Sequence, residues 1–263
     1  MGVTAGGIWH DTRAVVARHW QVFATLAGAT VFLPNAAMRL LAPAGASPQA
    51  PADLPPGFWT LLALVLALQF IGVFAVAAIA ADPREGGGRT LGATLADAAP
   101  AFGKFVVALL LFVIGYAIAT VAASLVLAIV AVASPGALAG AGKGTAPMAL
   151  ASSLVAVVVP LLMWLWARLS PLVGVYLRED VGVVPGIRRA WALSKGATWP
   201  ILALLTMFVL ASVTVGTLQV SAGQAAGAGI AGMLLGLVFA GIGALFFVYA
   251  AAGTGVIYRQ LSA

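Results

Sequence analysis

The side chains best suited to chemistry in this sequence are the basic ones of a single stretch, residues 168–196. Five of the thirteen Lys and Arg residues fall there: Arg168, Arg178, Arg188, Arg189 and Lys195. Guanidinium and ammonium groups bind phosphate and carboxylate oxygens through short, charge-assisted hydrogen bonds. Near an anionic membrane surface each such cation contributes roughly 1 kcal/mol of attraction. These residues are therefore candidates for binding an anion or a lipid phosphate, and the alternative is that they fix the orientation of the chain.

Arg168 is set apart from the other four cations because it follows a long apolar run and comes three residues before Pro171. An arginine at the centre of a membrane helix costs about 2.5–3.5 kcal/mol on insertion scales, so it normally finds a partner or extends to the surface. A bidentate contact with a lipid phosphate is one interpretation. The other is structural: the side chain snorkels to the interface, or bonds to backbone carbonyls freed by Pro171.

The acidic residues and histidines form no pattern that supports catalysis. The seven acids are scattered: Asp11, Asp53, Asp82, Glu85, Asp97, Glu179 and Asp180. Both histidines, His10 and His19, lie near the N-terminus, and the sequence has no cysteine. Metal-assisted hydrolysis needs carboxylates and histidines gathered around one ion, so we predict no metal site, no cofactor and no enzymatic activity. Thirteen cations in 263 residues are also too sparse for a nucleic-acid-binding face.

The overall composition indicates that membrane helices position these residues. The chain is 63% hydrophobic and 8% charged, whereas soluble domains have about 25% charged residues. A bilayer core about 30 Å thick needs roughly 20 apolar residues per helix. We predict an all-α, polytopic membrane protein that forms a single transmembrane domain over residues 1–263. The six predicted spans are residues 20–38, 57–81, 105–134, 148–176, 199–221 and 229–258.

The cations are distributed unevenly between the two sides that these spans define. Eleven of the thirteen fall with the two termini, the second loop and the fourth loop, and only Arg39 and Lys143 fall on the other side. Because Lys and Arg in short loops mark the cytoplasmic side, we predict that both termini are cytoplasmic.

A threefold helix-hairpin repeat is also predicted. Segments that begin at Gly7, Gly92 and Gly186 each carry an aromatic residue at their fourteenth position and then enter an apolar span. The proposed units are residues 7–85, 92–179 and 186–260. Each unit would begin with a short amphipathic helix that lies along the cytoplasmic headgroup plane. In the first, the apolar face is predicted to consist of Ile8, Thr12, Val15, Val16 and His19.

Small residues recur at every fourth position of the last span, among them Gly232, Gly236 and Ala240. This spacing lets two membrane helices approach closely. We predict a helix-packing face here, with another span of the same chain as the partner, or another subunit as the alternative.

The stretch of residues 168–196 resembles the membrane domain of bacterial glycerophosphoryl diester phosphodiesterases and related six-span proteins. The matching positions are Arg168, Pro171, Glu179, Arg189, Trp191, Leu193, Ser194 and Gly196, with Ala190 where that family often has Ser. The resemblance is sharp over about thirty residues and otherwise architectural. It implies a bacterial cytoplasmic (inner) membrane. In the enzymes of that family a separate soluble domain carries the catalytic residues, and we find no such domain in this sequence.

We therefore expect a non-enzymatic integral membrane protein that interacts with lipid or anchors a partner. Its partners would be membrane lipids and a cytoplasmic or membrane protein, but not nucleic acid. The alternative is a transporter or flippase for a lipid-like or small amphipathic substrate, which the repeat, the prolines within spans and Arg168 favour. Ion-coupled transporters usually place acids inside their spans, and this sequence has none securely there.

Overall fold

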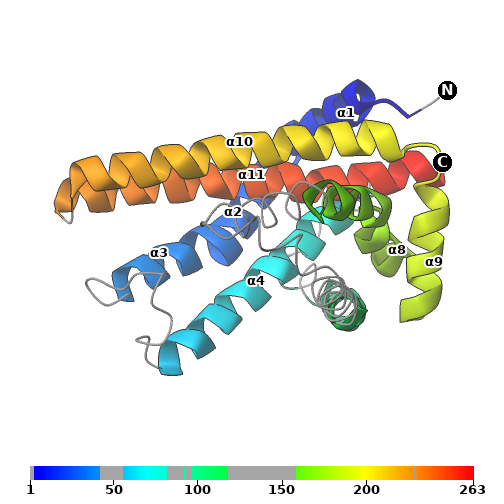
Figure 1. Ribbon diagram of the computed structural model, residues 1–263, viewed down its shortest axis with the longest axis horizontal. Helices are drawn as coiled ribbons and strands as arrows, with labels where there is room; N and C mark the ends of the chain where they lie inside the picture. Colours follow the sequence, from blue (N-terminus) through cyan, green and yellow to red (C-terminus); the bar gives the residue numbers. More distant parts are fainter. Residues whose placement is uncertain are drawn as a thin grey trace, which may run out of the picture.

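The computed structural model describes residues 3–41, 56–81, 98–115, 158–227 and 229–263, with the single positions 92, 96 and 117. All regular structure in these residues is helical, which confirms the predicted all-α fold (Figure 1). The labelled elements are α1 (Ala5–Arg18), α2 (Trp20–Ala27), the π-helical η1 (Gly28–Phe32), α3 (Leu33–Leu41), α4 (Pro56–Ala81), α8 (Leu172–Arg178), α9 (Val183–Leu193), α10 (Thr198–Ala226) and α11 (Ile230–Ser262). Residues 98–115 and 158–169 form two further helical segments without a label.

Six of the described helices are long and apolar enough to cross a membrane, so the chain is a multi-pass membrane protein, as predicted. They are Trp20–Met38, Gly57–Ala81, Ala98–Gly115, Val158–Arg178, Thr198–Gly223 and Ile230–Ser262. The first two have the predicted bounds. The third is already helical at Ala98, earlier than the predicted start at Phe105. The predicted span residues 118–134 and 148–157 lie outside the described residues.

Helix α11 lies at the centre of the bundle, where it contacts α4, α1, α10 and α8 (Figure 1). At two contacts the helices are so close that glycine is required. A Cβ on Gly255 would overlap the backbone of Ala77 in α4, and a Cβ on Gly174 in α8 would overlap the ring of Tyr258. Membrane helices associate through such close packing because lipid is as apolar as their side chains. The position of α4 and α8 against α11 therefore depends on these two glycines.

The first span passes through Pro34 without ending, because the wide π-helical turn of η1 precedes the proline. In a regular α-helix the Pro34 ring would press on the carbonyl of Thr30, four residues earlier. The Thr30 hydroxyl donates to the carbonyl of Leu26 at 2.8 Å and lies where a Cβ on Gly72 would be. The π-helical turn is thus also the place where the first span meets α4.

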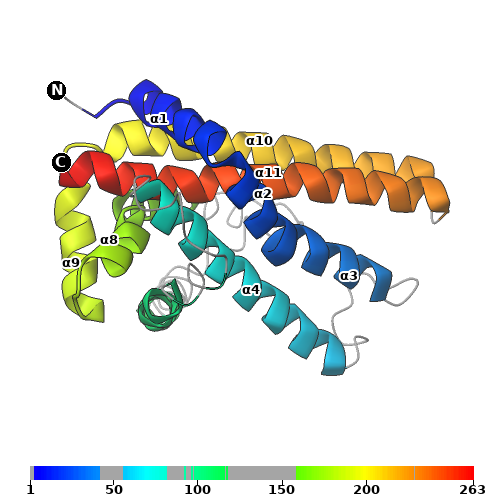
Figure 2. The same ribbon diagram turned by 180° about the vertical axis from the view of Figure 1, so that it is seen from behind.

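The short helix α1 has the apolar face that the sequence predicts. Its buried residues are Ile8, Thr12, Val15 and Val16, and His19, which follows the helix, is also buried. Protein covers this face, because α1 packs against α11 and α10 and its apolar side chains join the main core. Figure 2 shows that α1 leads into α2 through a short turn. The prediction that this face rests on lipid headgroups is therefore wrong for α1.

Helix α9 runs crosswise past the ends of α10 and α11 (Figure 1). On this helix Gly186 and Ala190 are buried, and Arg188 and Arg189 are exposed. Protein covers the buried positions here as well, because Gly186 lies against the ring of Tyr176 in α8 and Ala190 belongs to the same buried cluster. The order of short helix, span and span occurs as α1, α2–α3 and α4, and again as α9, α10 and α11. Most of the segment before the third span lies outside the described residues, so the threefold repeat stays a prediction.

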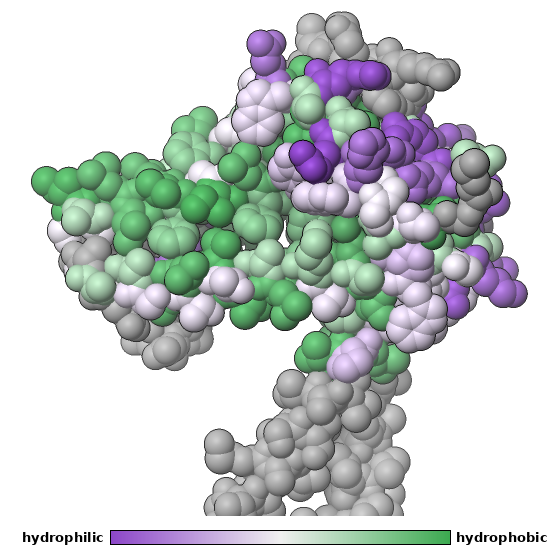
Figure 3. Space-filling view, turned by 90° about the horizontal axis from the view of Figure 1, so that it is seen from above, coloured by the Kyte–Doolittle hydropathy of each residue, from purple (hydrophilic) through white to green (hydrophobic). Residues whose placement is uncertain are grey.

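Both termini lie at the same end of the molecule, together with α9 (Figures 1 and 2). We call this end, formed by α1, residues 178–197 and the last turn of α11, the polar end. In Figure 3 hydrophilic residues gather on one side of the molecule, and hydrophobic ones dominate the side away from it. A chain that crosses the membrane an even number of times has both termini on one side, so this arrangement agrees with the six spans.

Two glycines of α11 provide a test of the close contact with α4. Gly255→Ala should lower the free energy of unfolding by about 1–3 kcal/mol, because the new Cβ meets the Ala77 backbone and overpacks the contact. Gly253→Ala is the matched control: its Cβ would meet no atom within 4 Å, and alanine raises helix propensity. Denaturant unfolding in detergent should therefore rank Gly253→Ala at or above the natural chain. Equal stability of the two variants would contradict this account.

Candidate functional site

The predicted cationic stretch folds into a junction between α8, α9 and α11, with the carboxylate of Glu179 at its centre. The Nε of Arg189 lies 3.2 Å from both carboxylate oxygens, and the Tyr258 hydroxyl donates to Oε1 at 3.3 Å. Glu179 follows the last residue of α8, while Arg189 belongs to α9 and Tyr258 to α11. The Glu179 side chain is only 24% exposed, so water competes weakly for these charge-assisted bonds. Glu179 therefore ties three helices together.

Arg178 points to a different helix from its neighbour Glu179. Its Nη2 donates to the backbone carbonyl of Ala78, in the last turn of α4, at 3.0 Å. The last carbonyls of a helix have no partner within the helix and carry partial negative charge. The guanidinium therefore caps α4, and Arg178 is engaged in structure as well as being a candidate for anion binding.

Arg168 lies against two indole rings that also contact each other. Its Cζ is 5.4 Å from the centroid of the Trp164 ring and 5.2 Å from that of Trp191, and the two rings meet edge to face at 5.3 Å. Cation–π contacts of this kind contribute about 0.5–2 kcal/mol each. Within the described part of the chain, Nε and Nη1 of Arg168 are buried and have no hydrogen-bond partner. Arg168 thus links the fourth span to α9 through aromatic contacts.

Pro171 divides the fourth span into the segment 158–169 and α8. A proline has no N–H to donate to the carbonyl of Ala167, four residues earlier. The hydroxyl of Ser170 donates to that carbonyl instead, at 3.0 Å. The carbonyl that Pro171 frees is therefore bound by Ser170 and not by Arg168, which corrects one of the two roles predicted for Arg168.

Ser194 and Gly196 form the turn that connects α9 to α10. The buried Ser194 hydroxyl donates to the carbonyl of Trp191 at 3.1 Å, and the Ser194 carbonyl accepts from the Thr198 hydroxyl at 3.0 Å. Gly196 has a φ of 99°, which a side chain would strain. Leu193 packs against a buried cluster that includes Phe74, Tyr176 and Ala190. These residues of the predicted family motif therefore hold the turn in place.

Arg188 and Lys195 remain exposed on α9 and on the turn after it. Neither makes an ion pair in the described part of the chain. Among the five predicted cations, these two are the ones whose charge is least engaged within the protein.

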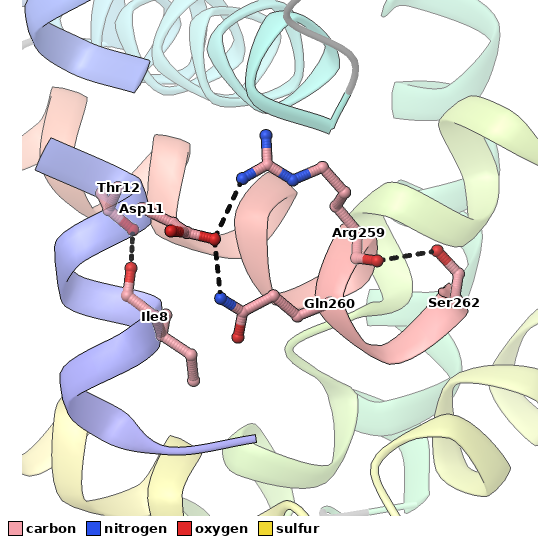
Figure 4. A network of polar contacts seen from close by, with 6 residues as sticks. All are labelled: Ile8, Asp11, Thr12, Arg259, Gln260 and Ser262. Atoms are coloured by element: carbon pink, nitrogen blue, oxygen red, sulfur yellow. Dashed lines mark hydrogen bonds and ion pairs between the residues drawn. The ribbon is translucent and has the colours of Figure 1, made fainter. Parts of the chain in front are cut away.

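A second polar network at the polar end joins the two ends of the chain (Figure 4). The Asp11 carboxylate of α1 accepts from Gln260 at 2.9 Å and from Arg259 at 3.2 Å, both in α11. Sequence reasoning did not find this pair, because its members are separated by almost the whole chain and neither belongs to a recognisable motif.

Lys104, at the start of the third span, also reaches the polar end. Its Nζ lies 3.5 Å from the Asp180 carboxylate, and the Asp180 side chain is fully exposed while that of Lys104 is 31% exposed. A surface pair of this length is weak. In the sequence, Lys104 is one of the second-loop cations that predict only the orientation of the chain. The structure places it beside Asp180.

An apolar cavity of about 1220 Å³ lies within the described residues. It lies between α4, the segments 98–115 and 158–169, α8, α10 and α11. Its walls are formed by side chains such as Phe70, Leu165 and Phe208. The two hydroxyl groups on its wall, those of Ser170 and Thr254, donate to carbonyls of their own helices at 3.0 and 2.7 Å. The cavity therefore offers an apolar ligand space and few polar contacts.

The small residues of the last span face α10 near the tip of the hairpin. A shallow hollow there is lined by Gln219, Gly223, Gly232 and Gly236, and Gly236 is buried. A Cβ on Gly232 would overlap the carbonyl of Gly227. Ala240 is half-buried on the same helix. The partner helix at Gly232 and Gly236 is thus α10 of the same chain.

Comparison with protein-family models, with curated proteins and with solved structures finds no match to this chain. The resemblance of residues 168–196 to the membrane domain of glycerophosphoryl diester phosphodiesterases therefore stays an expectation.

Substitutions of two adjacent acidic residues, Glu179 and Asp180, provide a test of the junction at Glu179. Glu179→Gln should lower the free energy of unfolding by about 1–3 kcal/mol, because it removes the charge that Arg189 and Tyr258 hold. Asp180→Asn is the matched control and should leave stability unchanged, because that carboxylate is fully exposed. Denaturant unfolding in detergent measures both. A Glu179→Gln variant as stable as Asp180→Asn would show that the junction does not stabilise the fold.

Proposed function

We propose that this multi-pass membrane protein is a non-catalytic module that binds membrane lipid, with an acyl chain in the apolar cavity. The cavity is the observation that carries the proposal. At about 1220 Å³ it exceeds the roughly 300–1,000 Å³ of ordinary small-molecule pockets. A polar substrate would find few partners there, because the hydroxyls of Ser170 and Thr254 are already bonded to backbone. A hydrocarbon chain needs no polar partner.

The depth of the cavity supports a lipid ligand. On α10 its wall includes Leu205, seven residues from the helix start at Thr198, and on α4 it reaches Phe70, eleven residues from Ala81. At 1.5 Å per residue these positions lie about 10 and 16 Å from the polar end. Half of a bilayer core is about 15 Å thick. The cavity therefore matches the depth of acyl chains in the leaflet next to the polar end.

The proposal assigns no catalytic step to this chain. Each acid in the described residues is paired with a cation: Asp11 with Arg259, Glu179 with Arg189 and Asp180 with Lys104. The first two pairs hold helices together, and no three metal-binding side chains come together in the described residues. Ordinary structural roles thus account for these carboxylates.

A transporter or flippase is the second candidate, and one observation favours it. The fourth span is interrupted at Ser170 and Pro171, and the wall of the cavity includes Ser170 and Leu172 on either side of that proline. Interrupted helices at the ligand site are common in transporters. A lipid that entered from one leaflet and left into the other would require this break to move.

Filling the cavity tests the proposal. Gly253 lines the cavity, and a Cβ there would meet no atom within 4 Å, so Gly253→Phe should occupy the acyl-chain space. Native mass spectrometry of the purified chain should then show loss of most of the tightly bound lipid. Gly243→Phe is the matched control: that glycine is exposed on the same helix with equally open space, away from the cavity. Retention of lipid by Gly253→Phe would refute the proposed site.

We also propose that the polar end faces the cytoplasm of a bacterial inner membrane, as the excess of Lys and Arg on that side favours. A reporter domain that works only in the cytoplasm should be active when it is fused to the N-terminus and when it is fused to the C-terminus. A reporter that is active outside the cytoplasm at either end would contradict this orientation.

A further inference from the structure

We propose that the lipid in the cavity is an anionic phospholipid and that Lys104 binds its phosphate. This inference rests on the proposed function, since it assigns the headgroup of the lipid whose acyl chain lies in the cavity. It adds a specificity-determining residue outside the five cations that the sequence suggests.

The first argument is the position of Lys104 on its helix. The third span contributes Ala108, Leu111, Phe112 and Gly115 to the cavity wall. The wall also includes Phe105, Leu109 and Val113, so Lys104, which precedes Ala108, Leu111 and Gly115 by four, seven and eleven residues, lies at one edge of the cavity-lining face of the helix. It stands one turn closer to the polar end, where its Nζ approaches Asp180. An acyl chain in the cavity would therefore carry its headgroup toward this ammonium group.

The second argument is that Lys104 can change partner. Its contact with Asp180 is long, at 3.5 Å, and the Asp180 carboxylate is fully exposed. Water and salt weaken such a pair. A phosphate held at the cavity mouth by its own acyl chains would compete well for the same ammonium group, because Lys binds phosphate as a compact point charge.

The third argument is the net charge of the polar end, which sets a background preference for anionic lipid to which Lys104 adds. Residues 178–195 add the exposed cations Arg188 and Lys195, which make no ion pair in the described part of the chain. A net positive surface of this kind favours anionic headgroups over zwitterionic ones. Arg168 contributes less to this surface charge, because its guanidinium contacts the rings of Trp164 and Trp191 and two of its nitrogens are buried.

The test compares two phospholipids with identical acyl chains, phosphatidylglycerol and phosphatidylcholine, added together to the full chain in detergent. Native mass spectrometry gives the ratio of the two bound lipids. Both lipids carry a phosphate, but the choline of phosphatidylcholine carries a positive charge that a nearby Lys repels, so one Lys should favour phosphatidylglycerol about fivefold. Lys104→Gln should lower the ratio about fivefold, to the background preference set by the other cations of the polar end. Asp180→Asn should raise it, because the competing carboxylate is gone.

The size of the Lys104→Gln effect separates ligand binding from a structural ion pair. If Lys104 and Asp180 served only each other, Lys104→Gln would lower the ratio no more than the loss of another exposed cation does, and that result overturns the proposal. Arg188→Gln is the matched control, an exposed cation of the polar end outside the cavity wall, and it should lower the ratio much less than Lys104→Gln does. An equal loss in Arg188→Gln would assign the preference to the general surface charge and also overturn the role of Lys104.

The failure of this inference can be told apart from that of the proposed function. If both phospholipids bind equally and Gly253→Phe displaces both, the cavity binds acyl chains and the assignment of Lys104 is wrong. If neither lipid binds, or if a protein occupies the cavity instead, the proposed function itself fails.

Discussion

The close contact of α11 with α4 and α8 is the constraint on which the rest of the structure depends. In lipid, apolar helices gain little from hiding their side chains from solvent, so they associate where their backbones can approach. Gly255 and Gly174 provide that approach. Because α11 is central, its position sets that of α1, α4, α8 and α10 around it. The cavity and the polar end are both consequences of how these helices are held.

The polar groups of the described residues gather at the ends of helices that this packing has already brought together. Asp11 binds Arg259 and Gln260, Glu179 binds Arg189 and Tyr258, and Arg178 caps α4. Each contact joins two or more helices at the polar end, where headgroups and water reduce the cost of burying charge. The same charged residues that predict the orientation of the chain therefore also join its helices. A role in orientation does not exclude a structural role for the basic stretch. Arg188 and Lys195 make no ion pair in the described residues, so their charges are available to an anion from outside the protein.

The sequence predicts the features that depend on local pattern. Hydropathy marks the six spans, because roughly 20 consecutive apolar residues suffice to identify one, and the periodicity of α1 identifies its buried face. What covers that face was not predictable, because α10 and α11 lie about two hundred residues away. The same limit applies to the pairing of Asp11 with Arg259 and to Lys104 beside Asp180. Arg168 stood out in the sequence, but its contact with the ring of Trp191 depends on how α9 packs beside the fourth span.

Two glycines of α11 show how packing and ligand space arise from one residue type. Gly255 faces the backbone of α4, and its missing side chain lets two helices meet. Gly253 comes two residues earlier and so lies on a nearly opposite face of the helix. It lines the cavity, and a Cβ there would meet open space. In a membrane an unfilled apolar space of this size is accessible to hydrocarbon, which water would not displace. The same helix therefore fixes the bundle on one face and leaves room for an acyl chain on the other, so that lipid occupancy does not require the core contacts to open.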